Sequence, residues 1–516
     1  MNAPVSKDSG GDNFTECFPK SKEDNDSPQL DQTLDSPQLQ DSQFEESFSQ
    51  SPLPSTDLDF ESLFERFDAQ EKDHSIFHWP WVEFPNQSGQ YHGGLIQSPS
   101  PNNTPDALKP RSTEIRTEIY NAIGSLNIPE DEPRLKPTFE ALDILTPERI
   151  HTFIKLYFHH WHRHGPIIHE PTFEPSKTAL PLLLSVFAIG GMYSKDPLEV
   201  SMMKLLLDFI EIAVYSSVRI EDDYEIKQSA PTGKNDECEE QRQLEEFQGA
   251  YLMVVVQYWA GNAMAKKRVR QQRFMRLVSI ARSRLALTTQ HQVNFTLSNN
   301  QDFRSWIRRE CILRTMNIMM TLDNAFGIFN NLPPHFNWSE LDLELPCESK
   351  YFEATSYDDM HDRSCFPQRK AKVTEAFQLF FLQASPQSDR FDPVEKGALN
   401  MWDLQILVHV FYTFVWQQLF GNPVASVLPD TLNPFIASVK LALHNWKRVW
   451  DEVQCGIAPA ELLAMGFPGS AERYWLVTRF VIHSFENNRG KPLVPIKADV
   501  DDTGAHLKPA MSLIHN

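Results

Sequence analysis

Apolar residues recur at helical spacing beyond about residue 138. Thr146 followed by Pro147 is typical of a helix start, because a threonine side chain can cap the first turn and proline is tolerated at the first helical position. The residues that follow place one apolar face at i, i+3, i+4, i+7, i+8 and i+11. This face consists of Ile150, Phe153, Ile154, Tyr157, Phe158 and Trp161.

A second start signal, Asp196 and Pro197 with Glu199, precedes another helical pattern. Its apolar face is predicted to contain Leu198, Met202, Leu205, Leu206, Phe209 and Ile212. Residues 180–193 and 250–261 are apolar on nearly every side but shorter than the roughly 20 residues of a membrane helix, so they are predicted to be buried helices.

The rest of this region also favours helices. Helices are expected at about 239–260, 263–287, 302–328, 369–384, 394–420, 431–453 and 470–487, with an irregular connection at 335–368. No run of alternating strands is found, so the predicted fold class is all-α, a multi-helix domain.

The N-terminal part has a different composition. Residues 1–78 contain 5 Lys and Arg and 18 Asp and Glu, which is −13 of the total net charge of −21. This part is also rich in Ser, Pro and Gln, and such a stretch buries too little apolar surface to offset the entropy of ordering. We predict a disordered acidic region over 1–137, with a short helix at about 112–126, and a folded domain over 138–516 with its core at about 140–490.

Residues 56–68 form a candidate activation segment within the acidic region. One helical face is bulky and apolar, and acidic residues surround it. Such a helix could fold into a groove of a partner, as acidic–hydrophobic activation regions do, or it could dock on its own domain. The residues of this face are Phe60, Leu63, Phe64 and Phe67.

A basic stretch begins at Lys266 and Lys267 and continues through Arg268 and Arg270. Clustered Lys and Arg can be a nuclear localisation signal or a nucleic-acid patch. The same residues also fit the solvated cationic side of an amphipathic helix, which is the favoured interpretation and which could attract the acidic N-terminal region.

Five histidines cluster around Trp161, and imidazole is a common zinc ligand. No thiolate lies among them, and adjacent helical residues point in different directions, so a structural helix end is favoured over a metal site. The six cysteines lie far apart in sequence, which argues against a zinc module. A disulfide framework is not expected in so large a chain without a secretory signal. The histidines are His159, His160, His162, His164 and His169.

The sequence contains no nucleophile elbow, phosphate-binding loop, zinc-protease motif or dinucleotide fingerprint, so we assign no catalytic residue and no enzyme activity. The net negative charge also argues against a surface built chiefly for phosphate contact with nucleic acid.

Four blocks, in this order, resemble the fungal-specific transcription factor domain, the helical middle homology or xylanolytic transcriptional activator regulatory domain. The blocks are 157–173, 180–194, 257–282 and 306–347, the last with Asn331-Leu332-Pro333-Pro334 and Leu345-Pro346-Cys347. The resemblance implies a nuclear fungal regulator of RNA polymerase II transcription. Similar proteins usually carry a zinc finger upstream, and here the finger is expected to be missing, so no cofactor is assigned unless that finger precedes this sequence.

The expected partners are the transcription machinery or a coactivator, and promoter DNA reached indirectly or through the missing zinc module. A homodimer or heterodimer is also considered, and no membrane association is expected. Two alternatives stay open. One is a finger-less cofactor or inhibitor that pairs with a DNA-binding paralogue, and the less favoured one is an enzyme on a helical scaffold.

Overall fold

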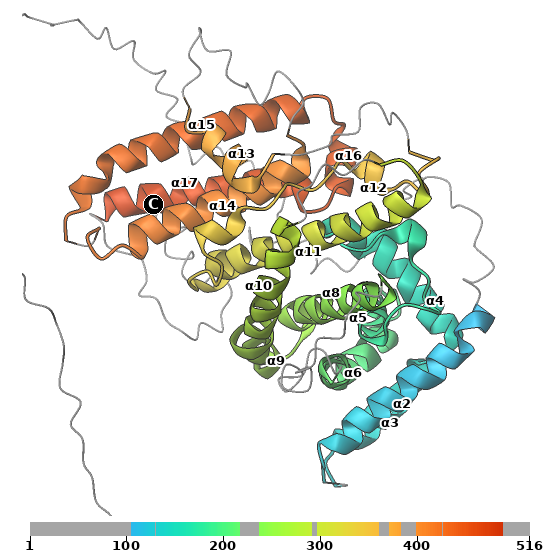
Figure 1. Cartoon of the computed structure of the whole chain (residues 1–516). Helices are drawn as coiled ribbons and strands as arrows, with labels where there is room; N and C mark the ends of the chain where they lie inside the picture. The colour runs from blue at the N-terminus through green and yellow to red at the C-terminus, as the bar shows by residue number, and fades with distance from the viewer. Residues whose placement is uncertain are drawn as a thin grey trace, which may run out of the picture. The chain divides into compact units, whose positions relative to one another are not determined.

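The computed structural model describes residues 105–129, 131–216, 237–290, 297–360, 371–382, 399–425 and 427–488. Within these ranges every regular element is a helix, and the extended pairing is a single antiparallel bridge between Glu344 and Lys372 (Figure 1). The all-α prediction is confirmed. None of the helices in the described ranges is long and apolar enough to cross a membrane.

The α-helices of these ranges follow in chain order. They are α2 (Lys109–Ser125), α3 (Leu135–Ala141), α4 (Pro147–Leu156), α5 (Leu180–Met192), α6 (Pro197–Tyr215), α8 (Glu237–Ala260), α9 (Ala263–Arg268), α10 (Phe274–Gln290), α11 (Asn300–Asn330), α12 (Ser349–Phe352), α13 (Val373–Leu379), α14 (Met401–Phe420), α15 (Asn433–Gln454), α16 (Pro459–Ala464) and α17 (Ala471–Asn487). Short turns of π and 3-10 helix join several of them, including Tyr157–Trp161 and Val269–Arg273.

Helix α4 begins where the sequence predicts. The Thr146 hydroxyl accepts a hydrogen bond from the Arg149 backbone N–H at 3.2 Å, which satisfies one of the free donors of the first turn. Ile150, Phe153 and Ile154 are buried, as expected for the apolar face.

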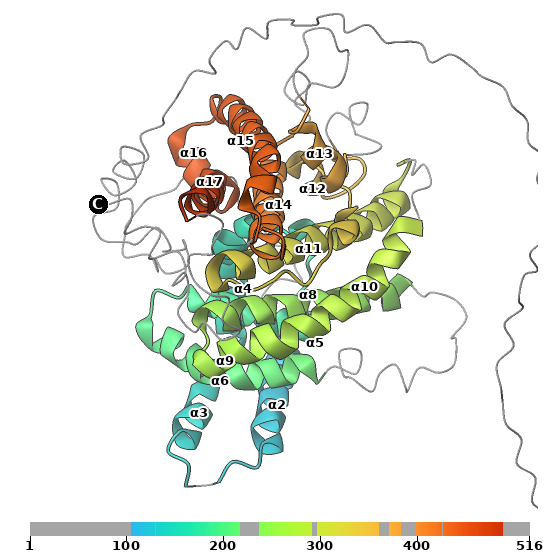
Figure 2. The ribbon, with the colours of Figure 1, turned by 90° about the vertical axis from the view of Figure 1, so that its left-hand side faces the viewer.

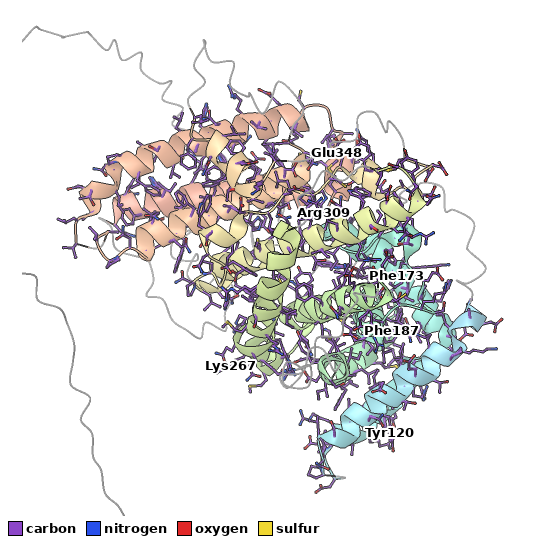
Figure 3. The ribbon with its side chains drawn as sticks, viewed as in Figure 1. Tyr120, Phe173, Phe187, Lys267, Arg309 and Glu348 are labelled. Carbon is purple, nitrogen blue, oxygen red and sulfur yellow. The ribbon has the colours of Figure 1, made fainter. Side chains whose placement is uncertain are left out.

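Helix α5 is the centre of the N-terminal group of helices and packs against α4, α6 and α8. It is buried along nearly its whole length, and Phe187 lies inside while Tyr120 of α2 lies outside (Figure 3). A Cβ atom at Gly190 would overlap the Phe153 carbonyl oxygen and lie 2.6 Å from its carbonyl carbon. The absence of a side chain at Gly190 therefore lets α5 approach the backbone of α4.

The predicted apolar face of α6 is partly wrong. Leu198 is 65% exposed and Leu205 is 37% exposed, whereas Met203 and Leu207 are buried. Apolar residues occur on several sides of this helix, so spacing alone does not select one face. The neighbours α2, α3, α5 and α8 decide which side is covered.

The folded part begins before residue 138, which corrects the expected boundary. Helix α2 contains the short helix expected at 112–126, and its residues Ile115 and Ile119 are fully buried. Helices α2 and α3 lie side by side and both pack against α6 (Figure 2). The sequence around these helices is polar and rich in proline, which is typical of disorder. The few apolar residues that pack these helices against the fold do not change that overall composition.

In the C-terminal group, α14 packs against α11, α13, α15 and α17. Trp446 and Trp450 of α15 stack with ring centroids 5.4 Å apart. The helices expected at 394–420, 431–453 and 470–487 are present, whereas the one expected at 369–384 spans only Val373–Leu379. The helix expected at 263–287 is interrupted by the π turn Val269–Arg273.

Candidate regulatory site

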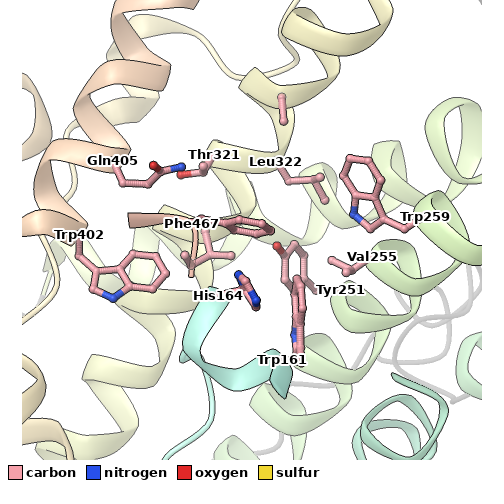
Figure 4. A pocket seen from close by; sticks show the side chains of 12 residues that line it. Trp161, His164, Tyr251, Val255, Trp259, Thr321, Leu322, Trp402, Gln405 and Phe467 are labelled. Atoms are coloured by element: carbon pink, nitrogen blue, oxygen red, sulfur yellow. The ribbon is translucent and has the colours of Figure 1, made fainter. Parts of the chain in front are cut away.

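An apolar pocket lies where α8, α11 and α14 meet the turn that follows α4 (Figure 4). It has about 40 Å³ of cavity volume within about 460 Å³ of empty space that includes its open side. The lining side chains come from five separate segments of the chain. They are Trp161, His164, Tyr251, Val255, Trp259, Ile318, Thr321, Leu322, Ala325, Trp402, Gln405 and Phe467.

The pocket walls are mainly aromatic and uncharged. Trp161 stacks on His164 with ring centroids 5.5 Å apart, and Phe467 lies 4.4 Å from the same imidazole. Burial lowers the pKa of His164 to about 3, with smaller contributions from Arg163 and His160, so this ring is neutral at pH 7. A charged ligand would therefore lose its hydration without gaining a partner of opposite charge.

Gln405 supplies a buried amide to the pocket. The residue is 1% exposed, and its Oε1 atom is buried without a hydrogen-bond partner among the described residues. Its Nε2 atom lies 3.4 Å from Nδ1 of His409. That Nδ1 also lies 2.8 Å from the Gln405 backbone oxygen, to which it donates, so it carries the proton. The amide therefore has an unmet hydrogen-bonding atom in either orientation.

The clustered histidine side chains contact different neighbouring residues and do not face a common point. His160 stacks on Tyr193 with ring centroids 5.1 Å apart, and His162 lies 5.2 Å from the ring of Phe158. His169 lies 2.8 Å from the Thr172 hydroxyl oxygen and 3.1 Å from the Ala354 backbone oxygen. Burial lowers the pKa of His169 to about 4. These imidazoles act here as packing groups around the helix end.

Metal-ligand geometry is absent from the part of the chain that the structure describes. No group of three or more His, Cys, Asp or Glu side chains there is arranged to hold a metal ion. The four cysteines in these ranges, Cys238, Cys311, Cys347 and Cys455, carry no disulfide.

The basic stretch is largely occupied by contacts within the fold. Arg270 is 8% exposed, and Lys266, Lys267 and Arg268 are half-buried, with Lys267 on α9 (Figure 3). Burial, with Arg270 nearby, lowers the pKa of Lys266. A localisation signal must be exposed to be bound, and these four side chains are partly or fully buried. Nuclear import through these residues stays a prediction from the sequence.

Glu211 of α6 is the anionic centre of this stretch. It is 1% exposed and pairs with Arg268 at 2.5 Å and with Arg273 at 2.7 Å. Gln257 also donates to Glu211 at 3.0 Å. Hydrogen bonding to Glu211 raises the pKa of Arg268. Much of the positive charge that could attract the acidic N-terminal region is therefore already paired.

Glu211→Gln is expected to lower the free energy of unfolding by about 2 kcal/mol, because it removes a buried carboxylate from two guanidinium groups. Urea unfolding measures the change. Asp208→Asn is the matched control, since Asp208 pairs with the same Arg268 but is 42% exposed, and it should cost less than about 1 kcal/mol. Equal losses in the two variants would contradict the central role of Glu211.

The candidate activation face, Phe60, Leu63, Phe64 and Phe67, lies outside the described residues. It stays a prediction from the sequence.

Comparison with known proteins identifies the helical region. Residues 154–387 match the model of the fungal specific transcription factor domain. This chain carries a fungal-specific transcription factor domain. The predicted resemblance is confirmed, and the domain belongs to a family of transcription factors, not enzymes.

Two curated proteins are similar in sequence to this chain. Transcription factor verF of Penicillium polonicum is 26% identical over 366 residues, which cover 66% of this chain and 48% of that protein. Zinc finger protein zas1 of Schizosaccharomyces pombe (strain 972) is 24% identical over 299 residues, which cover 56% of this chain and 30% of that protein. The matched part thus spans about half, or less, of these relatives. No solved structure matches the chain.

The Leu-Pro-Cys block of the fungal-specific transcription factor domain has a structural role. Glu310 and Arg314 of α11 pair at 2.8 Å and are each 4% exposed. Glu310 accepts the Cys347 backbone N–H at 2.8 Å, and Arg314 donates to the Cys347 backbone oxygen at 2.7 Å. The guanidinium of Arg314 also lies 3.9 Å from the ring centroid of Phe352. This clamp holds the irregular connection after α11 against that helix.

The pocket is not predictable from the sequence patterns. Trp161 and Trp259 belong to two of the four blocks that resemble the family, whereas Trp402, Gln405 and Phe467 lie beyond the matched residues 154–387. Each looks like an ordinary helix or turn residue. A buried glutamine in an apolar helix is the one signal that could have pointed to α14.

Proposed function

We propose that this protein regulates RNA polymerase II transcription in a fungal nucleus, with the helical domain as its regulatory part and residues 56–68 as its activation segment. The match of residues 154–387 to the fungal specific transcription factor domain carries this proposal. The acidic composition of residues 1–78 supports an activation role, because acidic neighbours keep an apolar helix soluble and speed its encounter with a partner.

DNA contact is proposed to come from a zinc module outside this sequence or from a partner. The name of zas1 describes a zinc finger protein, and the matched residues cover only 30% of that relative. The six cysteines of this chain, spread from Cys17 to Cys455, are too far apart in sequence for a finger.

The activation segment can be tested by fusing residues 1–78 to an unrelated DNA-binding domain. The fusion is expected to activate a reporter, and replacing Phe60, Leu63, Phe64 and Phe67 by Ala is expected to reduce the output to background, because the face that docks on the partner is removed. Reporter output at equal fusion-protein levels is the measurement.

Phe44→Ala with Phe48→Ala is the matched control, since it removes aromatic residues from the same acidic region. Output that survives the four substitutions would contradict activation through this face. If the intact fusion is silent but the full chain binds and inhibits a finger-bearing paralogue, the cofactor alternative replaces the activator.

A further inference from the structure

We propose that the C-terminal segment of this chain covers an exposed apolar turn between α14 and α15. The apolar turn presents Val424, Val427 and Leu428, and the segment contributes Leu493-Val494-Pro495-Ile496. The segment lies outside the described residues, so the contact is inferred from the described surface and from the sequence that follows α17. It is a contact within the chain and does not depend on the proposed function in transcription.

The apolar turn places three aliphatic side chains on one side. Val424, Val427 and Leu428 are 49%, 75% and 55% exposed. The N–H groups of Val427 and Leu428 both donate to the Val424 carbonyl oxygen, at 3.1 and 2.8 Å, so these side chains follow the i, i+3 and i+4 spacing of one helix face. Ala425 is fully buried and holds the turn to the core. Single exposed apolar residues are normal, whereas a contiguous group is typical of an interaction site.

Helix α17 ends at the same end of the C-terminal group as the apolar turn, at the left of Figure 1. The rings of Phe485 in α17 and Phe420 in α14 have centroids 6.0 Å apart, and Glu486 pairs with Lys440 of α15 at 2.8 Å. Phe420 is the last residue of α14, and the connection that carries the turn follows it directly. The chain therefore leaves α17 close to the helix ends that the apolar turn joins.

The sequence after α17 supplies an apolar group within reach. Leu493 lies five residues beyond Asn488, and five extended residues span roughly 17 Å. Pro492 and Pro495 favour an extended backbone at the residue before each of them. The sequence therefore predicts that the chain departs from the helix and brings four consecutive apolar residues, ending at Ile496, to the apolar turn.

Tethering and charge favour this segment over a separate molecule. A short link gives an effective concentration in roughly the millimolar range, so a small apolar contact is enough to occupy the surface. Asp430 is exposed and is the only charged residue of the connection 421–432, whereas Lys491 and Lys497 flank the apolar residues of the segment. The net charge of −21 opposes the approach of a second copy of the chain.

The test uses the full chain with Val427→Cys and Val494→Cys, oxidised with diamide. Peptide mass spectrometry measures how fast the two introduced cysteines form a disulfide. The disulfide is expected to form within one chain, at a rate that does not depend on protein concentration. Mixing isotope-labelled and unlabelled chains distinguishes bonds within a chain from bonds between chains.

Further substitutions separate the apolar contact from the effect of the tether. Leu493→Asp with Ile496→Asp keeps the tether length and removes the apolar group, so disulfide formation should become about tenfold slower. Leu507→Asp with Leu513→Asp is the matched control, because it makes the same changes later in the C-terminal sequence. It should leave the rate unchanged. Circular dichroism verifies that all variants are folded.

The proposal is overturned if the introduced cysteines do not react with each other, if the disulfide joins two chains, or if Leu493→Asp with Ile496→Asp leaves the rate unchanged. No reporter enters the measurement. A failure of the activation fusion would therefore leave this contact standing, and a failure here would leave the proposed function standing.

Discussion

Lowering the pH from 7 to 5 is expected to reduce the free energy of unfolding by roughly 5 kcal/mol, which is comparable to the whole stability of many domains. The cause is a set of buried neutral histidines. His164, His169 and His409 are 4%, 3% and 0% exposed. Burial lowers the pKa of His164 to about 3 and the pKa values of His169 and His409 to about 4.

The direction follows from proton binding. Between about pH 4 and pH 6.5 these imidazoles are neutral in the folded protein but take up protons in the unfolded chain, whose histidines titrate near 6.5. The unfolded state therefore binds more protons, and acid favours it. The stability is present above about pH 6.5 and is lost as the pH falls, by about 1.4 kcal/mol per pH unit for each group. Urea unfolding at several pH values measures this slope.

His409→Phe is expected to reduce the loss between pH 7 and 5 by about 2 kcal/mol, because one buried proton acceptor is removed. The pH slope is compared, not the stability at pH 7, because the new ring also changes the packing against Tyr474, 4.1 Å away. His444→Gln is the control, since this imidazole is exposed and meets water in both states. An unfolding midpoint that is the same at pH 7 and 5 would refute the argument.

Gly190→Ala is expected to destabilise the protein by about 3 kcal/mol or more, or to prevent accumulation of folded chain, because the new methyl group meets backbone and not a flexible side chain. The added Cβ would overlap the Phe153 carbonyl oxygen. Relief requires α4 and α5 to separate, and α5 also packs against α6 and α8. Urea unfolding, or the yield of soluble protein, measures the effect.

Gly124→Ala is the matched control. Gly124 lies in α2, and a Cβ atom there would have nothing within 4 Å. Alanine loses less conformational entropy than glycine in a helix, so this variant should be more stable by about 0.5–1 kcal/mol. If Gly190→Ala proved as harmless as Gly124→Ala, the close approach of α4 and α5 would be incorrect.

Local signals in the sequence predicted the elements well. Thr146 caps α4, and Asp196 caps α6 by accepting the Leu198 N–H at 2.9 Å. These interactions join residues two or three positions apart, so neighbouring letters are enough to predict them. The buried helices at 180–193 and 250–261 are also predictable, because an apolar surface on every side must be covered.

Prediction failed where a choice depended on distant residues. The covered side of α6 and the early start of the fold at α2 both depend on contacts between helices. The basic stretch looks like a solvated face until Glu211, which lies 57 positions before Arg268, is placed beside it. Charge in a sequence does not reveal which charges are paired.

The sequence by itself determined that the chain is helical, where most helices begin, and that four blocks resemble the fungal-specific transcription factor domain. Capping, spacing and family blocks are properties of residues close together in the chain. Only the tertiary structure decided which helix faces are buried and why position 190 requires a glycine. It also decided that Trp161, Tyr251 and Gln405 line one pocket. Such groupings arise when helices distant in sequence pack together, and their geometry is set by all of the contacting side chains at once.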